Sequence, residues 1–388
     1  MHLWLGLTTG LVVLVVAITG CLYVFSEEIA PIVYKDRLTI EVPHGEPRLP
    51  LSQLREVAKA AVPDTVPLVR TYIPTAADQT VSFAFTQYRE HAWSYSDYVA
   101  FNQTVFVNPY SGAVVAIENT KWEFFNVTYW IHISLLLPYD IGAPLVTYSV
   151  YLFMVMLLTG LVLWWPGRRK KVKRKSFWFV WKKTTSRKRK NYDLHQILGF
   201  YVLPLGLLFA VTGLFYASPH MNALVLWIAN GGSTVAEGEL PPPDPVFPLT
   251  QDPYDLIYHQ VDSMAVGSKS IMIRPPRRPG FPYAARAYMG GQNYKRQEFY
   301  FDPNSIRLQE AITYGDRNSG GKYAVMNYDL HVGSIGGLPT KILAFIASLI
   351  VASLPITGFY IWWNRGRKKK KKKGKRRLHQ HKADVVPA

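Results

Sequence analysis

The chain has 388 residues and a net charge of +18, from 44 Lys and Arg against 26 Asp and Glu. A balance this basic is typical of nucleic-acid-binding proteins. However, charged residues make up only 18% of the chain and hydrophobic residues 49%, whereas about 25% of a soluble domain is charged. The single cysteine, Cys21, excludes a disulfide framework and any zinc or iron–sulfur site built from cysteines.

The positive charge is concentrated in two segments. Residues 167–190 contain thirteen Lys and Arg and no acid, and residues 364–388 contain twelve with a single acid, Asp384. These segments carry a net charge of +24, so the rest of the chain carries −6. Each segment directly follows a long apolar run, which predicts contact with anionic lipid at a membrane surface and no nucleic-acid partner.

Four apolar runs contain no Asp, Glu, Lys or Arg. They are Leu3–Ser26, Ile141–Gly167, Leu194–Ala236 and Ile342–Asn364, and the third narrows to Ile197–Ala217. A helix needs about 20 apolar residues to cross the hydrocarbon core of a bilayer. Tryptophan pairs close the second and fourth runs, as is typical of helices that end at a membrane interface. We therefore predict four transmembrane helices rather than buried core helices.

Loops rich in Lys and Arg stay in the cytoplasm, so both basic segments and both termini are predicted to be cytoplasmic in a multi-pass protein of the bacterial inner membrane. The predicted segments are transmembrane helices at 1–26, 141–166, 194–217 and 341–363, periplasmic segments at 27–140 and 218–340, a basic loop at 167–193 and a basic tail at 364–388. The stretch Ile18–Cys21 also fits a lipoprotein cleavage box. No Lys or Arg precedes it, whereas a signal peptide begins with a basic region, so the transmembrane interpretation is preferred.

The chain contains an internal duplication. His2 and His195 each precede a Gly by four residues and a Thr-Gly pair by seventeen. The second and fourth apolar runs each end in Thr-Gly, three further residues and Trp-Trp. His132 and His331 lie 27 and 26 residues before these last two Thr-Gly pairs. Because both halves run in the same direction, this is a parallel repeat.

The two periplasmic segments repeat as well. Residues 51–61 and Pro253–Met264 have apolar residues at helical spacing, and strand-like stretches follow them. The strands end in matching turns at Asn108-Pro109 and Asp302-Pro303. Each half is therefore predicted to consist of a helix, an α+β module, a second helix and a basic end.

Four of the ten histidines occupy matching positions in the repeat. His2 and His195 start helices at the cytoplasmic face, while His132 and His331 lie just outside the second and fourth helices. The pseudo-symmetry is expected to bring each pair together, one pair at each face of the bilayer. An ionisable side chain near a membrane is a functional hypothesis by default, and imidazole is a strong ligand of iron, copper and zinc.

Two histidines per site fit a bis-histidine haem b best, because haem supplies four nitrogens and needs only two axial ligands. Zinc would normally take more protein ligands, and the chain has no Cys-x-x-Cys-His for covalent attachment of a c-type haem. Each Thr-Gly pair of the first and third helices lies about 25 Å along its helix from the histidine. The small glycine of each pair either lets its helix approach a haem at the opposite, outer face of the membrane or serves close packing between helices. His220, whose counterpart in the repeat is Glu27, is kept as a reserve ligand.

Three motifs resemble the PepSY-associated transmembrane proteins. They are His2-Leu-Trp-Leu-Gly6, Leu158-Thr-Gly-Leu-Val-Leu-Trp-Trp165 and the turn Asn108-Pro-Tyr-Ser-Gly112. The resemblance implies a membrane α-helical fold with four transmembrane helices in two parallel repeats, each with a periplasmic PepSY-like α+β module. The family includes inner-membrane siderophore reductases described as di-haem proteins. The resemblance therefore implies two haem b groups whose iron atoms are ligated by His2, His195, His132 and His331. Because His2 directly follows Met1, either the true start differs or the inner haem is more exposed than usual.

The predicted function is that of a haem-dependent oxidoreductase of the ferric-siderophore reductase type. A di-haem b transmembrane electron-transfer protein would reduce ferric siderophores or other ferric chelates on the periplasmic side, because hard oxygen chelators hold Fe(II) far less tightly than Fe(III). No Gly-x-Gly-x-x-Gly follows a predicted strand. The expected electron donor is therefore a quinol or a separate cytoplasmic reductase.

The alternative is a membrane-anchored PepSY regulator or inhibitor of a periplasmic peptidase, without redox activity and with structural histidines. A transporter is disfavoured, because the apolar runs contain no carboxylate, Lys or Arg to mark an ion path. Arg277, Arg278 and the stretch Phe281–Tyr288 could contact an anionic chelate, although an ordinary polar loop is the preferred interpretation. The sequence predicts no catalytic residue, siderophore identity or oligomeric state.

Overall fold

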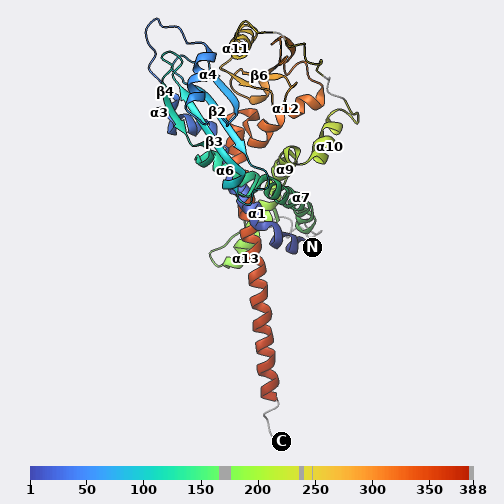
Figure 1. Ribbon diagram of the computed structural model, residues 1–388. Helices are drawn as coiled ribbons and strands as arrows, with labels where there is room; N and C mark the ends of the chain where they lie inside the picture. The colour runs from blue at the N-terminus through green and yellow to red at the C-terminus, as the bar shows by residue number, and fades with distance from the viewer. Residues whose placement is uncertain (166–175, 236–239, 247, 384–388) are drawn as a thin grey trace.

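The computed structural model describes residues 1–165, 176–235, 240–246 and 248–383, with side chains described as far as Arg365. Outside the described residues lie Pro166 of the predicted second helix, residues 167–175 of the predicted basic loop, residues 236–239 and 247 of the second predicted periplasmic segment, and residues 384–388 of the predicted tail. Figure 1 shows a sheet with helices packed on it, and beneath the sheet a bundle of long helices from which α13 extends.

Four helices form the bundle. They are α1 (His2–Tyr23), α7 (Tyr139–Trp164), α9 (Arg187–Ala217) and α13 (Leu338–Ala383). Within the described ranges, these four helices are long and apolar enough to cross a membrane. Both α1 and α9 pack against α7 and α13, so the two equivalent helices α1 and α9 lie diagonally across the bundle. The centre is filled by apolar side chains from all four helices: Val13, Phe153, Leu157, Val202, Ala210, Ala347 and Val351. The predicted membrane α-helical fold class is confirmed.

The segments between the helices form one antiparallel sheet. Its described strands are β1 (Leu68–Pro74), β2 (Val81–Tyr88), β3 (Val99–Val107), β4 (Val114–Glu118), β5 (Ser270–Arg274), β6 (Tyr283–Tyr288), β7 (Gln297–Phe301) and β8 (Leu308–Ile312). The strand order is β4-β3-β2-β1-β5-β6-β7-β8, so each repeat contributes four strands, and β1 pairs with β5 at the centre. The sequence predicts two modules, and the structure adds that they join edge to edge. This pairing removes one exposed strand edge from each module.

Two helices cover the face of the sheet that points away from the bundle: α4 (Leu51–Ala60) and α11 (Pro253–Met264) (Figure 1). Both lie where the apolar spacing of the sequence predicts them. Successive strand residues point to opposite faces, so alternate side chains such as Phe83 and Phe299 pack under these helices with Leu54 and Ile257. The other face of the sheet points toward the bundle.

Short helices connect the sheet to the bundle. They are α2 (Ser26–Val33), α3 (Lys35–Leu38), α5 (Tyr95–Tyr98), α6 (Phe124–Ser134), α10 (Pro219–Ala229) and α12 (Ser319–Val332), with 3-10 turns η1 (Thr120–Trp122), η2 (Asn293–Lys295) and η3 (Ser334–Gly336). α6 and α12 each end in a sharp reversal, at Leu135 with φ 57° and at Gly333 with φ 78°. After α6 the chain passes so closely that a Cβ on Gly142 would lie 2.0 Å from the carbonyl oxygen of Ser134. These reversals place α6 against α1 and α7, and α12 against α9.

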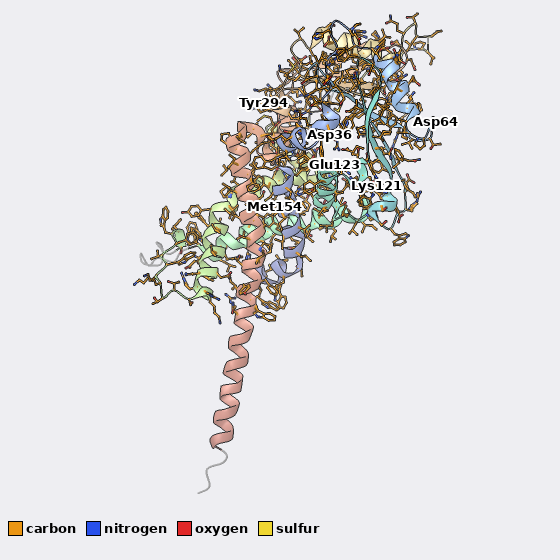
Figure 2. The ribbon with its side chains drawn as sticks, turned by 90° about the vertical axis from the view of Figure 1, so that its left-hand side faces the viewer. Asp36, Asp64, Lys121, Glu123, Met154 and Tyr294 are labelled. Atoms are coloured by element: carbon orange, nitrogen blue, oxygen red, sulfur yellow. The ribbon has the colours of Figure 1, made fainter. Side chains whose placement is uncertain are left out.

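The start of α6 is fixed by Glu123, which lies where the sheet meets the bundle (Figure 2). Its carboxylate accepts hydrogen bonds from the main-chain N–H groups of Phe125 and Asn126 at 2.8 and 2.6 Å. It also accepts the hydroxyl proton of Tyr34 at 2.5 Å. Burial, followed by this bond to Glu123, raises the pKa of Tyr34 to about 12. The phenol therefore remains a hydrogen-bond donor at neutral pH and ties α6 to the chain after α2.

Candidate functional site: two histidine pairs

The four histidines of the repeat form two pairs. His2 of α1 lies beside His195 of α9, with ring centroids 6.5 Å apart and ring planes at 79°. His132 of α6 lies beside His331 of α12, with centroids 6.1 Å apart and planes at 73°. His132 contacts Thr19, seventeen residues after His2 on α1, which is about 25 Å along a helix. The two pairs therefore lie at opposite ends of the bundle.

Each histidine is held by the threonine of a Thr-Gly pair on another helix. The Nδ1–Oγ1 distances are 3.0 Å for His2–Thr159, 2.9 Å for His195–Thr357, 3.1 Å for His132–Thr19 and 2.8 Å for His331–Thr212. The Thr-Gly pairs of α1 and α9 therefore contact the histidines at the far end from their own His. The same contact occurs four times, so the four Thr-Gly pairs have one common structural role.

These hydrogen bonds determine which ring nitrogen is free. Each threonine hydroxyl donates to the carbonyl oxygen four residues earlier in its own helix, at 2.7–3.0 Å, so its oxygen accepts from the histidine. Nδ1 therefore carries the proton, and Nε2 keeps the lone pair that a metal ligand needs.

The glycine after each threonine leaves room for the imidazole. A Cβ added to the glycine would lie 3.2–3.4 Å from Cε1 of the neighbouring ring, at Gly160 beside His2, Gly358 beside His195, Gly20 beside His132 and Gly213 beside His331. Contacts this short are tighter than ordinary van der Waals packing. Threonine and glycine thus act together, one orienting the ring and the other admitting it.

The pair His2 and His195 lines a cavity of about 370 Å³ inside the bundle. Its walls are mostly apolar, and five glycines contribute to them: Gly6, Gly10, Gly160, Gly199 and Gly358. Trp164, which also lines the cavity, stacks on Phe200 with ring centroids 3.9 Å apart. The volume lies in the range of small-molecule and cofactor pockets.

Two asparagines were missed by sequence reasoning. Asn191 and Asn327 each lie four residues before a histidine of the second repeat. Each donates from Nδ2 to the carbonyl oxygen of the threonine that holds that histidine, at 3.0 Å in both cases. The signal was present in the sequence, because Asn-x-x-x-His occurs at both positions of the second half. In the first half, Thr128 occupies the place before His132.

The sequence matches the family of the PepSY-associated TM region over residues 1–365. The chain belongs to this family. The matched range contains all four histidines and their threonines, together with the sheet and the four long helices. No curated protein matches the chain.

In this PepSY-associated TM protein, a buried acid fixes the helix that carries His331. Asp329 accepts hydrogen bonds from the main-chain N–H groups of Asn293 and Tyr294 at 3.0 and 2.8 Å. It also accepts the hydroxyl proton of Ser334 at 2.5 Å. Tyr294 lies beside the upper end of the bundle (Figure 2). Asp329 therefore joins α12 to the connection between β6 and β7 and sets the position of the pair His132 and His331.

Other residues considered from the sequence lie outside the two pairs. His220 is exposed at the start of α10, and Arg277 and Arg278 are exposed in the loop between β5 and β6. Among the described residues, no group of three or more His, Cys, Asp or Glu could hold a metal ion. Each pair offers two nitrogen ligands, a set that suits a cofactor supplying the remaining ligands of its own metal.

Proposed function

We propose that the protein is a di-haem b transmembrane electron-transfer protein that reduces ferric siderophores or other ferric chelates for iron release. The observation that carries this proposal is the arrangement of four imidazoles in two pairs, each ring bonded through Nδ1 to a threonine. Because Nδ1 holds the proton, every Nε2 is available to a metal. Two such nitrogens per site are the axial ligand set of a b-type haem.

The ring spacing fits a metal shared by two imidazoles. A metal–imidazole bond is about 2 Å long and a ring nitrogen lies about 1 Å from the ring centroid, so two imidazoles on opposite sides of one metal have centroids about 6 Å apart. The observed separations are 6.5 and 6.1 Å. At the inner pair, the apolar cavity of about 370 Å³ with glycines in its walls provides space for a flat macrocycle.

His2 and His195 would hold one haem and His132 and His331 the other, and bound haem supplies reversible one-electron chemistry. The protein's part is to orient the ligands. The four threonines fix the orientation of each ring, and their hydroxyl oxygens, as acceptors at Nδ1, would increase the basicity of Nε2 as a ligand. The apolar wall beside the inner pair keeps water away from that site.

We place the basic segments and both termini in the cytoplasm and the sheet in the periplasm of a bacterial inner membrane. α13 continues past its apolar part into a run rich in Lys and Arg, which would lie beside anionic lipid. A quinol or a separate cytoplasmic reductase would donate electrons at the His2 and His195 end. Each Fe(III) chelate would take up one electron at the His132 and His331 end and release Fe(II). No nucleic-acid partner is proposed.

The other role considered, regulation of a periplasmic peptidase without redox activity, gives no reason for four imidazoles held in a single tautomer. An absorption spectrum of the purified full-length protein separates the two roles. We expect a Soret band, sharp α-bands on reduction, and re-oxidation by an added ferric siderophore. A colourless protein would contradict haem binding. Reduced haem that no ferric chelate re-oxidises would contradict the proposed substrate.

A further inference from the structure

The face of the sheet that points toward the bundle carries three arginines where the two modules meet, and two more, Arg296 and Arg317, lie beside this face against Glu298. Thr71 of β1 and Ile273 of β5 are paired in antiparallel strands; Arg70 directly precedes Thr71, and Arg274 directly follows Ile273. They therefore occupy opposing positions on one face of the sheet. Arg286 lies on that same face of the next strand, β6. With Arg296 and Arg317, these residues form what we call the arginine cluster.

The cluster contains more positive charge than its acids neutralise. Glu298 of β7 makes ion pairs with three of its members: Arg286 at 3.0 Å, Arg296 at 2.8 Å and Arg317 at 2.7 Å. In the part of the chain that the structure describes, Arg70 and Arg274 have neither a carboxylate nor a hydrogen-bond partner. One buried carboxylate thus pairs with three of the five guanidinium groups, and the charges of Arg70 and Arg274 are left without a partner among the described residues.

This arrangement destabilises the sheet when no anion is bound to it. Like charges directly opposite each other on neighbouring strands are destabilising, and Arg70 and Arg274 are such a pair. Burial lowers the pKa of the Arg274 guanidinium, and the charges of Arg286, Arg70 and Arg277 lower it further. A bound anion would remove this repulsion, because a guanidinium binds oxygen anions through charge-assisted and often bidentate hydrogen bonds.

The arginine cluster lies near the outer histidine pair, His132 and His331. Arg296 donates to the carbonyl oxygen of Asn293 at 3.2 Å. The main-chain N–H of Asn293 in turn donates to Asp329 of α12 at 3.0 Å, two residues before His331. An anion held by the cluster would therefore lie between the sheet and the outer pair.

We propose that the arginine cluster is the binding site for multiply anionic ferric chelates, of which tris-catecholate complexes are an example, and that it selects them over uncharged tris-hydroxamates. The proposal rests on the proposed reductase function and names its substrate class. Three tyrosines share the same face, Tyr72, Tyr288 and Tyr300, and offer aromatic surface to a catechol ring. The matching face of the first repeat carries Ser82, Ala84 and Thr86 instead, so the site is asymmetric.

Equilibrium binding of gallium(III) complexes to the purified full-length protein tests this proposal without electron transfer, because Ga(III) replaces Fe(III) but is not reduced. We expect the trianionic gallium tris-catecholate to bind more tightly than the uncharged gallium tris-hydroxamate, and its affinity to fall as salt is added. Arg70→Gln and Arg274→Gln should each weaken catecholate binding about tenfold and leave hydroxamate binding unchanged. Arg89→Gln, at an exposed arginine just beyond β2, is the control with the same change of charge and should bind as the unmodified protein does.

The melting temperature provides a second measurement. If Arg70 only stabilised the fold, Arg70→Gln would lower it. Without ligand, Arg70→Gln should melt at the same temperature or higher, because it relieves the repulsion with Arg274. Equal affinity for the two gallium complexes, or an equal loss in Arg89→Gln, would overturn the proposal. Displacement of the catecholate complex by phosphatidylglycerol would assign the arginine cluster to lipid headgroups and also overturn it. None of these results would bear on haem binding or haem reduction.

Discussion

His195 donates a hydrogen bond from Nδ1 to Oγ1 of Thr357 at 2.9 Å, and Thr357 in turn donates to the carbonyl oxygen of Ser353 at 3.0 Å. The threonine can therefore accept but not donate at the imidazole, which fixes both the orientation and the tautomer of the ring. Because the same contact recurs at His2, His132 and His331, both halves of the duplication contain the threonine that orients each ring as well as the histidine itself.

Replacing one of these threonines by valine should weaken the site it serves. Thr159→Val keeps the shape of the side chain but removes the oxygen that accepts from His2. Loss of a hydrogen-bond partner behind a metal ligand typically costs 10–100-fold in affinity. We therefore expect partial loss of the inner haem during gel filtration, measured as haem per chain. Thr147→Val on the same helix is the control, because Thr147 bonds only to its own main chain at Ala143. Equal haem retention in the two variants would contradict the role of Thr159.

Adding a methyl group at the glycine beside a ring should displace that ring. A Cβ would lie 3.2 Å from Cε1 of His331 in Gly213→Ala and 3.3 Å from Cε1 of His195 in Gly358→Ala. Each variant is expected to perturb one site and spare the other, so each serves as the control for its counterpart. Low-temperature reduced spectra, which separate the α-bands of the two haems, provide the measurement. Identical spectra in both variants would show that the glycines do not admit the rings.

The buried amide of Asn327 should contribute to stability as well as to ligand position. Asn327 is fully buried and bonds to the carbonyl oxygen of Thr212 at 3.0 Å. Asn327→Leu leaves that carbonyl without its side-chain donor, a loss worth about 1–3 kcal/mol. We expect a lower melting temperature in detergent and a perturbed outer site. Asn364→Leu is the control, since the hydrogen bond from the Asn364 side-chain amide to the carbonyl oxygen of Tyr360 is exposed. This variant should melt at the same temperature as the unmodified protein.

Acid should destabilise the sheet through Glu298. Burial raises the pKa of this carboxyl, but Arg296, Arg286 and the hydrogen bonds from Arg296 and Arg317 outweigh burial and hold the pKa below its ordinary 4.5. A carboxyl with a lowered pKa contributes stability above its unfolded pKa, and that contribution is lost as pH falls through the folded pKa.

Glu298→Gln is therefore expected to be about 3–5 kcal/mol less stable at neutral pH, because it leaves buried guanidinium groups unpaired. The difference from the unmodified protein should shrink below about pH 4. Thermal unfolding across this pH range measures it, with Glu310→Gln at an exposed position of β8 as the control. A difference that is constant with pH would mean that the charge of Glu298 is not the source of its stabilisation.

Much of this architecture follows from the sequence because it depends on local patterns. Apolar length predicts the four spans, and apolar spacing predicts α4 and α11. Identical spacings from His2 and His195 to Thr-Gly predict that the two halves match. Spacing along one helix could not show which helix each Thr-Gly pair would contact, since Thr19 bonds to His132 through a tertiary contact.

The sequence also could not predict that the two modules join into one sheet, because this pairing is a tertiary contact. Strand pairing between β1 and β5 links residues about 200 positions apart, and no turn or loop length specifies it. The arginine cluster depends on that pairing, because Arg70 and Arg274 become neighbours only when the modules join. Arg277 and Arg278, which are exposed, lie beside a Tyr-rich stretch in the sequence but outside the arginine cluster.

The central claim is that each histidine pair holds one haem, and haem per chain measured by the pyridine haemochrome method tests it most directly. The unmodified protein should contain two haems, and His195→Ala and His331→Ala should each contain one, lost from opposite ends of the bundle. His220→Ala should still contain two, because His220 lies outside both pairs. A histidine variant that keeps both haems, or an unmodified protein that binds none, would contradict the account.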